Sequence, residues 1–404
     1  MDRRLRLAVV TETFPPEVNG VSLSLAKLLE GAGPFCDWQL VRVNRHDLDA
    51  PMPREIRLAG FPIPGYARLR GGFPAWISLR RAWRDDRPDL VHIATEGPLG
   101  LSALQVARAL NIPVCSDFRT HFEQYVDHYK VAWLEPFASG YLRYFHNRCD
   151  LNCVPTEMLA KQLKAQGYER LAVVPRGVDL ARFGPQHRDE ALRASWLGTR
   201  AQQAGPGKVP VLLCVSRMAA EKNLEVLLQA HRAATQSGSP ARLVMVGDGP
   251  IRASLERDYP EALFVGMKTG LELSRHYASA DLFCFPSQSE TFGNVILEAM
   301  ASALPVLAYR HGASAALLQD QEHGWILRDF SPSAFHEALK AALSQWTTQD
   351  PSRWQAMGEK VLAKAKTQSW SSVVDLMLSH WYALAFPTMK AKPEHESFAH
   401  PQQL

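Results

Sequence analysis

The sequence predicts an α/β protein made of two doubly wound domains. Short apolar runs, typical of buried parallel strands, alternate with segments of helical periodicity along most of the chain. The length of 404 residues is too great for one ordinary core. A polar stretch over residues 185–208, broken by Gly205-Pro206-Gly207, separates two such halves. We therefore predict domains over residues 1–184 and 209–369, joined by a linker over 185–208.

Composition excludes several classes of protein. With 46% hydrophobic and 21% charged residues the chain is globular, and it has no run of about 18 apolar residues that would predict a membrane span. The N-terminus enters a strand pattern without a small-residue cleavage site, so we expect no signal peptide and a cytoplasmic location. The net charge of +4 is too mild to indicate nucleic acid. Six cysteines in this length do not make a disulfide framework.

In the first half, apolar runs predict strands over residues 5–11, 38–43, 89–94, 114–118, 151–154 and 171–174. Helical patterns cover 22–30 and 99–110, and a third helix runs from Thr156 as N-cap to residue 166, with Gly167 as its stop. The loop after the first strand ends in Asn19-Gly20. It lacks G-x-G-x-x-G, which disfavours a nicotinamide or flavin site, and a single glycine there often only makes the turn.

Residues 67–84 carry five arginines and no acid, with Phe73, Trp76, Ile77 and Trp83 interleaved. Arginines with aromatic residues suit an anionic membrane surface, where the rings lie at headgroup depth and the guanidinium groups contact phosphates. A core-packed helix with a solvated basic face explains the pattern nearly as well. Both interpretations stay open at this stage.

Two patterns raise the question of a metal. Asp47 and Asp49 form a D-x-D pair, but they lie among ordinary polar residues and we interpret them as a solvated loop. His146, Cys149 and Cys153 have helical spacing, yet the run also reads as a helix end entering a strand. We predict no metal site and no cofactor.

In the second half, strands are predicted over residues 209–215, 243–246, 264–266, 281–285 and 306–309. Helical patterns follow over 332–344, 354–366 and 370–385. Residues 387–404 are rich in Lys, Pro, Glu, His and Gln with little to bury, so we expect a disordered tail.

The turn PSQSETFGNVILE, residues 286–298, joins a predicted buried strand to a helix. Ligands bind outside the carboxyl ends of parallel strands, where helix N-termini offer free N–H groups. Glu290 and Glu298 bracket the turn, and carboxylates accept paired hydrogen bonds from adjacent hydroxyls, so the turn suits a ligand that is part phosphate and part polyol. Alternatively, Glu290 stabilises the helix N-terminus and Glu298 lies on a solvated face.

Arg217 and Lys222 follow the predicted strand 209–215 at the start of a helix. Two cations there would concentrate positive potential where a diphosphate leaves. Paired surface charges are the alternative interpretation.

The segment ETFGNVILEAMASALPV resembles the E-x7-E signature of retaining GT-B glycosyltransferases of family 4. The resemblance covers roughly residues 5–385. It implies two Rossmann-like domains that face each other across a cleft, with the helix over 370–386 crossing back to the first domain. It also implies that Glu290 approaches the donor's hexose and that Glu298 holds the ribose. Arg217 and Lys222 match the family's R-x4-K and are the expected diphosphate clamp.

The same resemblance implies further contacts with a nucleotide-sugar donor. Backbone N–H groups of the Asn19-Gly20 loop would approach the diphosphate, and the backbone around Met267 would face the nucleobase. The remaining expected donor-binding positions are Gly247, Phe292, Gly293, Asn294 and Val295.

The segment THFEQYVDHYKVAWLEPFASGYLRYFHNRCD is similar to transferases that glycosylate lipids, including sulfoquinovosyl and mannosyl diacylglycerol types. It departs from the family pattern at one point. The family places an active-site histidine directly before the threonine, where this chain has Arg119, and the histidine here comes two places later at His121. Either His121 reaches the same pocket, since side chains two apart on an extended segment share a face, or Arg119 supplies positive charge itself.

The expected function is transfer of a hexose from a nucleoside diphosphate sugar, of the UDP-glucose or GDP-mannose class, to a lipid such as diacylglycerol or a glycolipid. The resemblance implies retention of the anomeric configuration and no bound metal. Three alternatives remain: a soluble or polysaccharide acceptor, epimerisation of a nucleotide sugar, and a non-enzymatic sugar-nucleotide binder.

Overall fold

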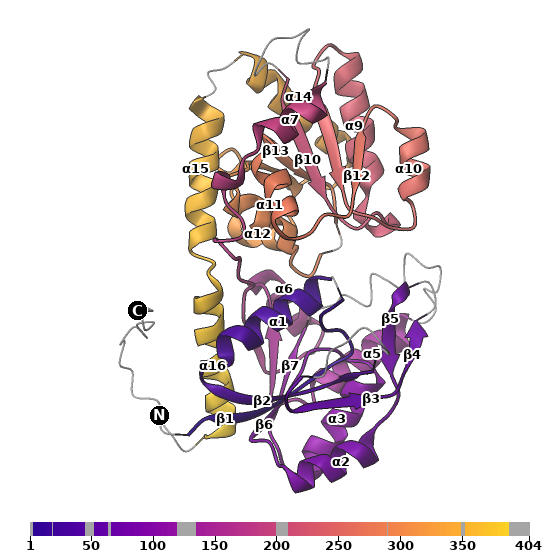
Figure 1. The fold of residues 1–404 in the computed structure, drawn as a ribbon, viewed down its shortest axis with the longest axis vertical. Coiled ribbons are helices and arrows are strands. Elements are labelled where there is room, and N and C mark those ends of the chain that lie inside the picture. The colour runs from indigo at the N-terminus through magenta and orange to yellow at the C-terminus, as the bar shows by residue number, and fades with distance from the viewer. Residues whose placement is uncertain are drawn as a thin grey trace.

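The computed structural model describes residues 3–17, 19–44, 52–63, 66–118, 135–198, 209–288, 290–348 and 352–387. Within them, two α/β domains lie one above the other along the long axis of the molecule (Figure 1). Each domain holds one parallel sheet with helices on both faces, which confirms the predicted fold class. The D-x-D pair, Arg119, His121, residues 199–208 and the tail from residue 388 lie outside the described residues.

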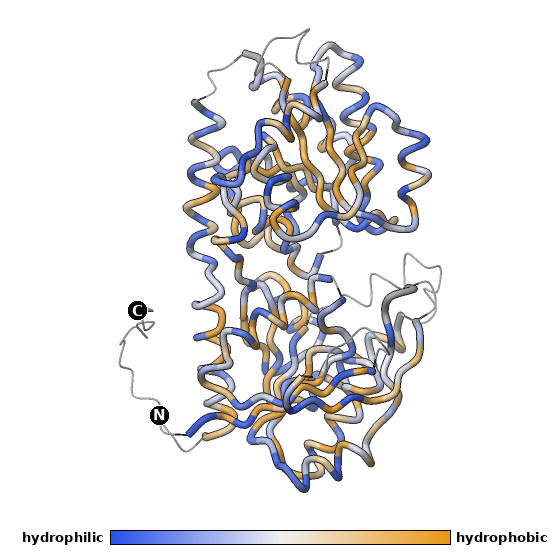
Figure 2. Tube along the Cα trace, in the orientation of Figure 1, coloured by the Kyte–Doolittle hydropathy of each residue, from blue (hydrophilic) through white to orange (hydrophobic). Residues whose placement is uncertain are grey.

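The first sheet has seven parallel strands in the order β3-β2-β1-β6-β7-β8-β9. Their bounds are β1 (Leu5–Thr11), β2 (Cys36–Val43), β3 (Glu55–Leu58), β6 (Leu90–Ile93), β7 (Val114–Asp117), β8 (Leu151–Val154) and β9 (Leu171–Val173). The inner strands are mostly apolar because both of their faces are covered, although β7 and β8 also carry the buried polar residues Ser116, Asp117 and Asn152; Figure 2 shows the hydropathy along the chain.

Helices cover both faces of this sheet. One face is packed by α1 (Gly20–Ala32) and by the last helix of the chain, α16 (Trp370–Ala385). The other face is packed by α2 (Trp76–Asp85), α3 (Pro98–Ala109) and α5 (Glu135–His146). A smaller apolar cluster joins α5 to α6 (Glu157–Ala165), whose N-cap is Thr156 as predicted, since its hydroxyl accepts a hydrogen bond from the N–H of Leu159.

The arginine-rich stretch over 67–84 is not a single helix. It is divided between β5 (Tyr66–Gly72), which pairs antiparallel with β4 (Gly60–Ile63), and α2, which begins at Trp76. The physical reason lies in Gly71, Gly72 and Pro74. Glycine disfavours a helix interior, and proline disfavours a helical conformation at the residue before it. A Cβ on Gly71 would also lie 2.6 Å from the ring of Phe61.

The second sheet has six parallel strands in the order β12-β11-β10-β13-β14-β15. Their bounds are β10 (Val211–Val215), β11 (Arg242–Val246), β12 (Leu263–Gly266), β13 (Leu282–Phe285), β14 (Val306–Tyr309) and β15 (Gly324–Leu327). Helices on its faces are α9 (Leu224–Gln236), α10 (Arg252–Asp258), α11 (Gly270–Ala278), α12 (Asn294–Ala301), α13 (Ala313–Leu317), α14 (Pro332–Thr348) and α15 (Ser352–Lys366). Two apolar clusters fill the space between this sheet and its helices.

The segment 185–198 differs from the linker that we predicted. It forms a short 3-10 turn, η2 (Pro185–His187), and a helix, α7 (Glu190–Leu197), which packs against the second domain. Trp196 is buried in that domain's core, and the buried Arg193 guanidinium lies 2.7 Å from the Asp281 carboxylate. Leu192, Trp196 and Leu197 pack against the core of the second domain, and most other residues of the segment are polar.

Two chain segments cross between the domains, and they lie side by side. The N–H of Val178 donates to the carbonyl of Gln368 at 2.9 Å, and Val178 forms an isolated parallel bridge with Ser369. A Cβ on Gly177 would lie 2.7 Å from the ring of Trp370. Helices α15 and α16 follow one another along one edge of the molecule and span both domains (Figure 1). Within the described ranges, no helix combines the length and apolar character needed to cross a membrane.

Candidate functional site

The predicted site residues gather where the strand order of the second sheet reverses. Strands β10 and β13 are neighbours there, and the chain leaves them toward opposite edges of the sheet. Arg217 and Lys222 follow β10, and Glu290 follows β13. Such a switch point leaves a crevice at the carboxyl ends of parallel strands, which is where ligands bind in open α/β sheets.

Lys222 and Glu290 are in direct contact although 68 positions separate them. The Nζ of Lys222 lies 2.5 Å from Oε1 of Glu290, and both side chains are mostly buried. The hydroxyl of Ser287 donates to the same carboxylate oxygen at 2.8 Å. Lys222 ends a 3-10 turn, η3 (Ala220–Lys222), and Asn223 after it adopts a left-handed conformation with φ of 54°. The fold therefore places a cation and a carboxylate side by side at the switch point.

Arg217 lies in the same turn and is about one third exposed, with its guanidinium 3.8 Å from the buried carboxylate of Glu221. Gly247, at the end of β11, is next to this turn. Its φ is +135°, and a Cβ there would lie 1.9 Å from the carbonyl oxygen of Ser216. Only glycine fits this close backbone approach. Gly247 therefore brings the turns after β10 and β11 together.

The turn between β13 and α12 has the conformation of a helix start. Gly293, with φ of +92°, precedes α12, so the N–H groups of Asn294 and Val295 belong to the first turn of that helix. Phe292 is buried, and its carbonyl accepts a 2.6 Å hydrogen bond from the N–H of Ala313. This hydrogen bond fixes the start of α12, and the first N–H groups of that helix lie in the turn that follows β13.

Glu298 is partly buried, and the prediction's alternative of a solvated face is wrong. The hydroxyl of Tyr277, on α11, donates to Oε2 of Glu298 at 2.8 Å. Burial raises the pKa of the Glu298 carboxyl to about 7, against the hydrogen bond from Tyr277 and the positive charge of Arg182. No sequence pattern identifies Tyr277 as a partner of Glu298, since helical periodicity marks it only as a core residue.

The loop between β1 and α1, in the first domain, lies beside the start of α12 in the second domain. The side chain of Asn19 caps α1, because its Oδ1 accepts a hydrogen bond from the N–H of Ser22 at 2.9 Å, and its Nδ2 donates to the hydroxyl of Thr13 at 2.7 Å. Asn19 therefore positions Gly20 rather than presenting a free amide. A Cβ on Gly20 would lie 3.5 Å from Nδ2 of Asn294, so the loop meets the start of α12 across the two domains.

Met267 directly follows β12 and is 54% exposed, so its side chain is available to a ligand at this edge of the sheet. Arg119 and His121 lie outside the described residues. The structure thus brings together predicted residues from the turns after β10, β11, β12 and β13 and from the loop after β1.

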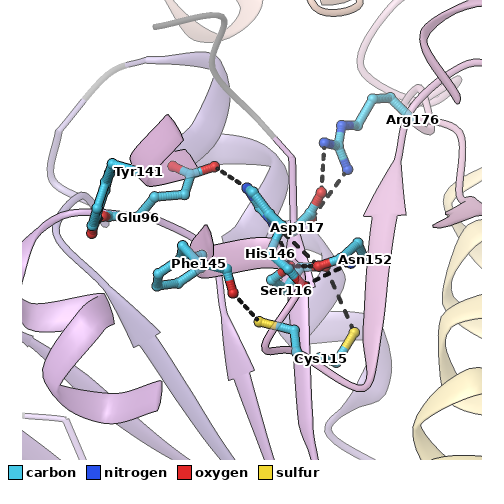
Figure 3. Close-up of polar contacts among 10 residues, drawn as sticks. Glu96, Cys115, Ser116, Asp117, Tyr141, Phe145, His146, Asn152 and Arg176 are labelled. Atoms are coloured by element: carbon cyan, nitrogen blue, oxygen red, sulfur yellow. Dashed lines mark hydrogen bonds and ion pairs between the residues drawn. The ribbon is translucent and has the colours of Figure 1, made fainter. Parts of the chain in front are cut away.

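A buried polar network lies at the carboxyl end of β7 (Figure 3). The hydroxyl of Ser116 donates to Asn152 Oδ1 at 2.6 Å, so it accepts from Nδ1 of His146 at 2.8 Å. Nε2 of that imidazole then faces Glu96 Oε1 at 3.4 Å. His146 is therefore part of the packing between α5 and the sheet. Across the described residues, no three His, Cys, Asp or Glu side chains gather in a way that could hold a metal ion.

The same view shows Arg176 beside Asp117, with 3.0 Å between Nη2 and Oδ1. Both side chains are buried. Asp117 ends β7, and Arg176 begins the segment that crosses to the second domain. This ion pair therefore ties the edge of the first sheet to the domain junction.

Gly312 supports the turn that carries Glu290. Its φ is +56°, and a Cβ there would lie 2.4 Å from the carbonyl oxygen of Phe292. Gly312→Ala is expected to lower the free energy of unfolding by about 1–3 kcal/mol, measured by urea denaturation. Gly270 has the same φ with no atom within 4 Å, so Gly270→Ala is the matched control. Equal losses in both variants would show that the contact with Phe292 contributes nothing.

The comparisons with known proteins agree with this geometry. Residues 21–182 match the family described as "Glycosyltransferase Family 4", and residues 209–345 match the family described as "Glycosyl transferases group 1". A "GDP-mannose-dependent alpha-mannosyltransferase" of Mycobacterium tuberculosis is 32% identical over 395 residues, covering 94% of this chain and 97% of that protein. An "Alpha-monoglucosyldiacylglycerol synthase" of Streptococcus pneumoniae is 30% identical over 341 residues, covering 79% of this chain and 74% of that protein.

Among solved structures, a sucrose-phosphate synthase from Thermosynechococcus elongatus superposes with a TM-score of 0.72 at 19% identity, covering 94% of this chain and 99% of that one. This likeness concerns the fold. Together with the family matches and the paired cations and carboxylates at the switch point, it shows that the chain belongs to glycosyltransferase family 4 and is a glycosyltransferase of the GT-B fold.

Proposed function

We propose that this glycosyltransferase transfers a hexose from a nucleoside diphosphate sugar to a lipid acceptor, with retention of the anomeric configuration and without a bound metal. The observation that carries the proposal is the contact of Lys222 with Glu290 at 2.5 Å, beside Arg217, at the switch point of the second sheet. The reaction needs a positive group beside the departing diphosphate and a negative group beside the cationic sugar carbon, and this contact holds one group of each charge. The relative named as GDP-mannose-dependent supports a donor of the GDP-mannose class, with UDP-glucose as the other candidate.

The difficult step is cleavage of the bond between the anomeric carbon and a phosphate oxygen. It leaves negative charge on the diphosphate and positive charge on the sugar ring. Arg217, Lys222 and the backbone N–H groups near Gly20 would stabilise the departing diphosphate. These cations supply the positive charge that a divalent metal provides in other transferases. Glu290, next to Lys222, would orient the hexose and favour the cationic carbon.

Retention follows from a reaction on one face of the sugar. The acceptor oxygen forms its bond to the anomeric carbon on the face from which the phosphate leaves. The departing phosphate oxygen takes the acceptor's proton, so no protein nucleophile is needed. Glu298 would accept hydrogen bonds from the ribose hydroxyls of the donor, and the backbone beside Met267 would contact the base.

A lipid acceptor is supported by the surface at the start of α2. Phe73, Trp76 and Ile77 are exposed, at 48%, 52% and 76% of their surface, and the side chains of Arg80 and Arg81 are exposed one turn further along the helix. Residues three and four apart share a helix face, so the cations adjoin the apolar side chains. This pattern suits peripheral contact with anionic lipid on the cytoplasmic side of a membrane. The relative named as a monoglucosyldiacylglycerol synthase is consistent with it.

The double variant Arg80→Gln/Arg81→Gln is expected to bind anionic vesicles roughly 30-fold more weakly, since each arginine near such a surface contributes about 1 kcal/mol. Co-sedimentation with phosphatidylglycerol vesicles measures the effect. Arg257→Gln/Arg275→Gln removes the same charge from exposed arginines of the second domain and serves as control. A similar loss in both variants would mean that net charge, and not this surface, governs binding.

The proposed function is tested with labelled UDP-glucose and GDP-mannose, offered with diacylglycerol vesicles or with soluble oligosaccharides. We expect label in the lipid extract and an α-linked product from the α-configured donor, determined by NMR. Label only in oligosaccharide would overturn the lipid acceptor. A β-linked product would overturn retention, and a protein that binds either donor without turnover would be a non-enzymatic binder.

A further inference from the structure

Tyr277 is packed in the core of the second domain and contacts Glu298 through its hydroxyl. It lies on α11, and its side chain is completely buried. Its ring meets Phe183 edge to face with centroids 5.7 Å apart, and it meets Phe283 at the same distance. A ring packed between two others has one available orientation, so the position of its hydroxyl is fixed by the core.

The Tyr277 hydroxyl donates its hydrogen bond to one oxygen of Glu298. The bond to Oε2 is 2.8 Å long, and among the described residues Oε1 accepts no hydrogen bond. The carboxylate is therefore anchored at one oxygen, which leaves the other for a ligand. Because this carboxylate is already held in place, ligand binding does not cost the conformational entropy of ordering its side chain.

The pKa shifts of Tyr277 and Glu298 also support a hydrogen bond from the phenol to an ionised carboxylate. Burial and the nearby Glu298 charge raise the pKa of Tyr277 well above its ordinary value, so the phenol stays protonated and remains a donor. Burial raises the pKa of Glu298 to about 7, while the Tyr277 hydrogen bond and the Arg182 charge oppose that rise. Both partners favour the ionised carboxylate, against the larger effect of burial. Arg182 stands beside Phe183 in the segment that leads from the domain junction.

We infer that Tyr277 is a positioning residue, which fixes the Glu298 carboxylate and keeps it ionised so that it can accept hydrogen bonds from the sugar hydroxyls of the donor nucleotide. The inference rests on the proposed function, because it takes Glu298 as a donor ligand. Tyr277 itself does not touch the substrate. Since only the ionised carboxylate accepts from both hydroxyls, nucleotide affinity should fall as the pH drops through the pKa of Glu298.

The test measures binding of GDP and of UDP by calorimetry between pH 5.5 and 8.5. Tyr277→Phe keeps the ring and removes the hydroxyl. We expect about 10-fold weaker binding of the nucleotide at pH 7, as for loss of a hydrogen bond to a charged group. We also expect the loss of affinity on acidification to begin at a higher pH than in the wild type, because the ionised carboxylate has lost a stabilising donor.

Tyr309→Phe is the matched control. Tyr309 is a buried tyrosine of the same domain whose hydroxyl donates to the carbonyl of Ser331 at 2.9 Å and lies beside Gln288, not Glu298. Melting curves of both variants report any general loss of stability. Arg182→Gln, which removes the positive charge near Glu298, is expected to shift the pH profile in the same direction as Tyr277→Phe.

The outcomes are distinct. If Tyr277→Phe and Tyr309→Phe show the same affinity and the same pH profile as the wild type, the inference is wrong and Tyr277 has only a packing role. If affinity falls equally in both tyrosine variants, the effect is one of stability and the inference also fails. If the wild-type protein binds neither GDP nor UDP, the proposed function itself fails.

Discussion

Lys222→Met is expected to lower kcat by about 10²–10³-fold, because it removes one preorganised positive group from the place where charge develops on the leaving diphosphate. The Nζ of Lys222 lies 2.5 Å from Glu290 in a mostly buried pair, and methionine keeps most of the side-chain length while removing the charge and the hydrogen-bond donor. The measurement is nucleotide release from whichever sugar nucleotide proves to be the donor, with kcat and KM determined separately. An unchanged kcat would contradict the role of Lys222 in the reaction.

Two further variants complete this experiment. Lys222→Met leaves the Glu290 carboxylate without its partner, and this loss of pairing can destabilise the protein by itself. The double variant Lys222→Met/Glu290→Gln restores neutrality and should fold with an activity as low as that of the single variant. Lys360→Met, an exposed lysine of the same domain that lies 3.9 Å from Glu322, should leave kcat within about twofold of the wild type.

Trp381→Ala is expected to reduce the stability of the first domain by about 3–5 kcal/mol. Trp381 lies on α16, is completely buried, and its ring meets the His92 ring edge to face at 5.4 Å. Truncation leaves a large cavity between the last helix and the first sheet. Urea denaturation should show an early transition that is absent from the wild type.

The destabilisation by Trp381→Ala should be confined to the first domain. The core that contains Trp381 is shared by α1, α16 and the first sheet, whereas most of the proposed nucleotide contacts lie in the second domain. GDP or UDP binding should therefore survive below the early transition. Ser379→Ala, at an exposed position of the same helix, should change stability by less than about 0.5 kcal/mol. A single unshifted transition in Trp381→Ala would show that α16 contributes little to the first domain.

The buried strands could be predicted from the sequence because parallel strands covered on both faces are continuous apolar runs, as in β10 and β13. The β4–β5 hairpin could not, since Gly60, Gly71 and Gly72 interrupt any alternating pattern and Pro62 lies within β4, where the register of the pairing shifts. Helix α7 was missed for a similar reason. Only the folded chain shows that Arg193 is buried, because its partner Asp281 is far along the sequence.

The sequence predicts those features of the site that depend on residues close to one another in the chain. The spacing of Glu290 and Glu298 and the two cations after β10 are visible in the sequence, and the fold brings these groups to one edge of the sheet. The contact between Lys222 and Glu290 depends on the order of β10 and β13, which no short pattern specifies. The hydrogen bond from Tyr277 to Glu298 likewise joins two helices. Asn19 was predicted at the right place, yet its amide is used to cap α1.

Because α16 completes the core of the first domain from the far end of the chain, that domain cannot finish folding as it leaves the ribosome. Its sheet must wait, with one apolar face partly uncovered, until nearly all of the second domain has been synthesised. Folding of the first domain is therefore completed only after the second domain has been translated. A chain cut short before residue 370 would expose that face to chaperones and proteases, so truncated products should be degraded.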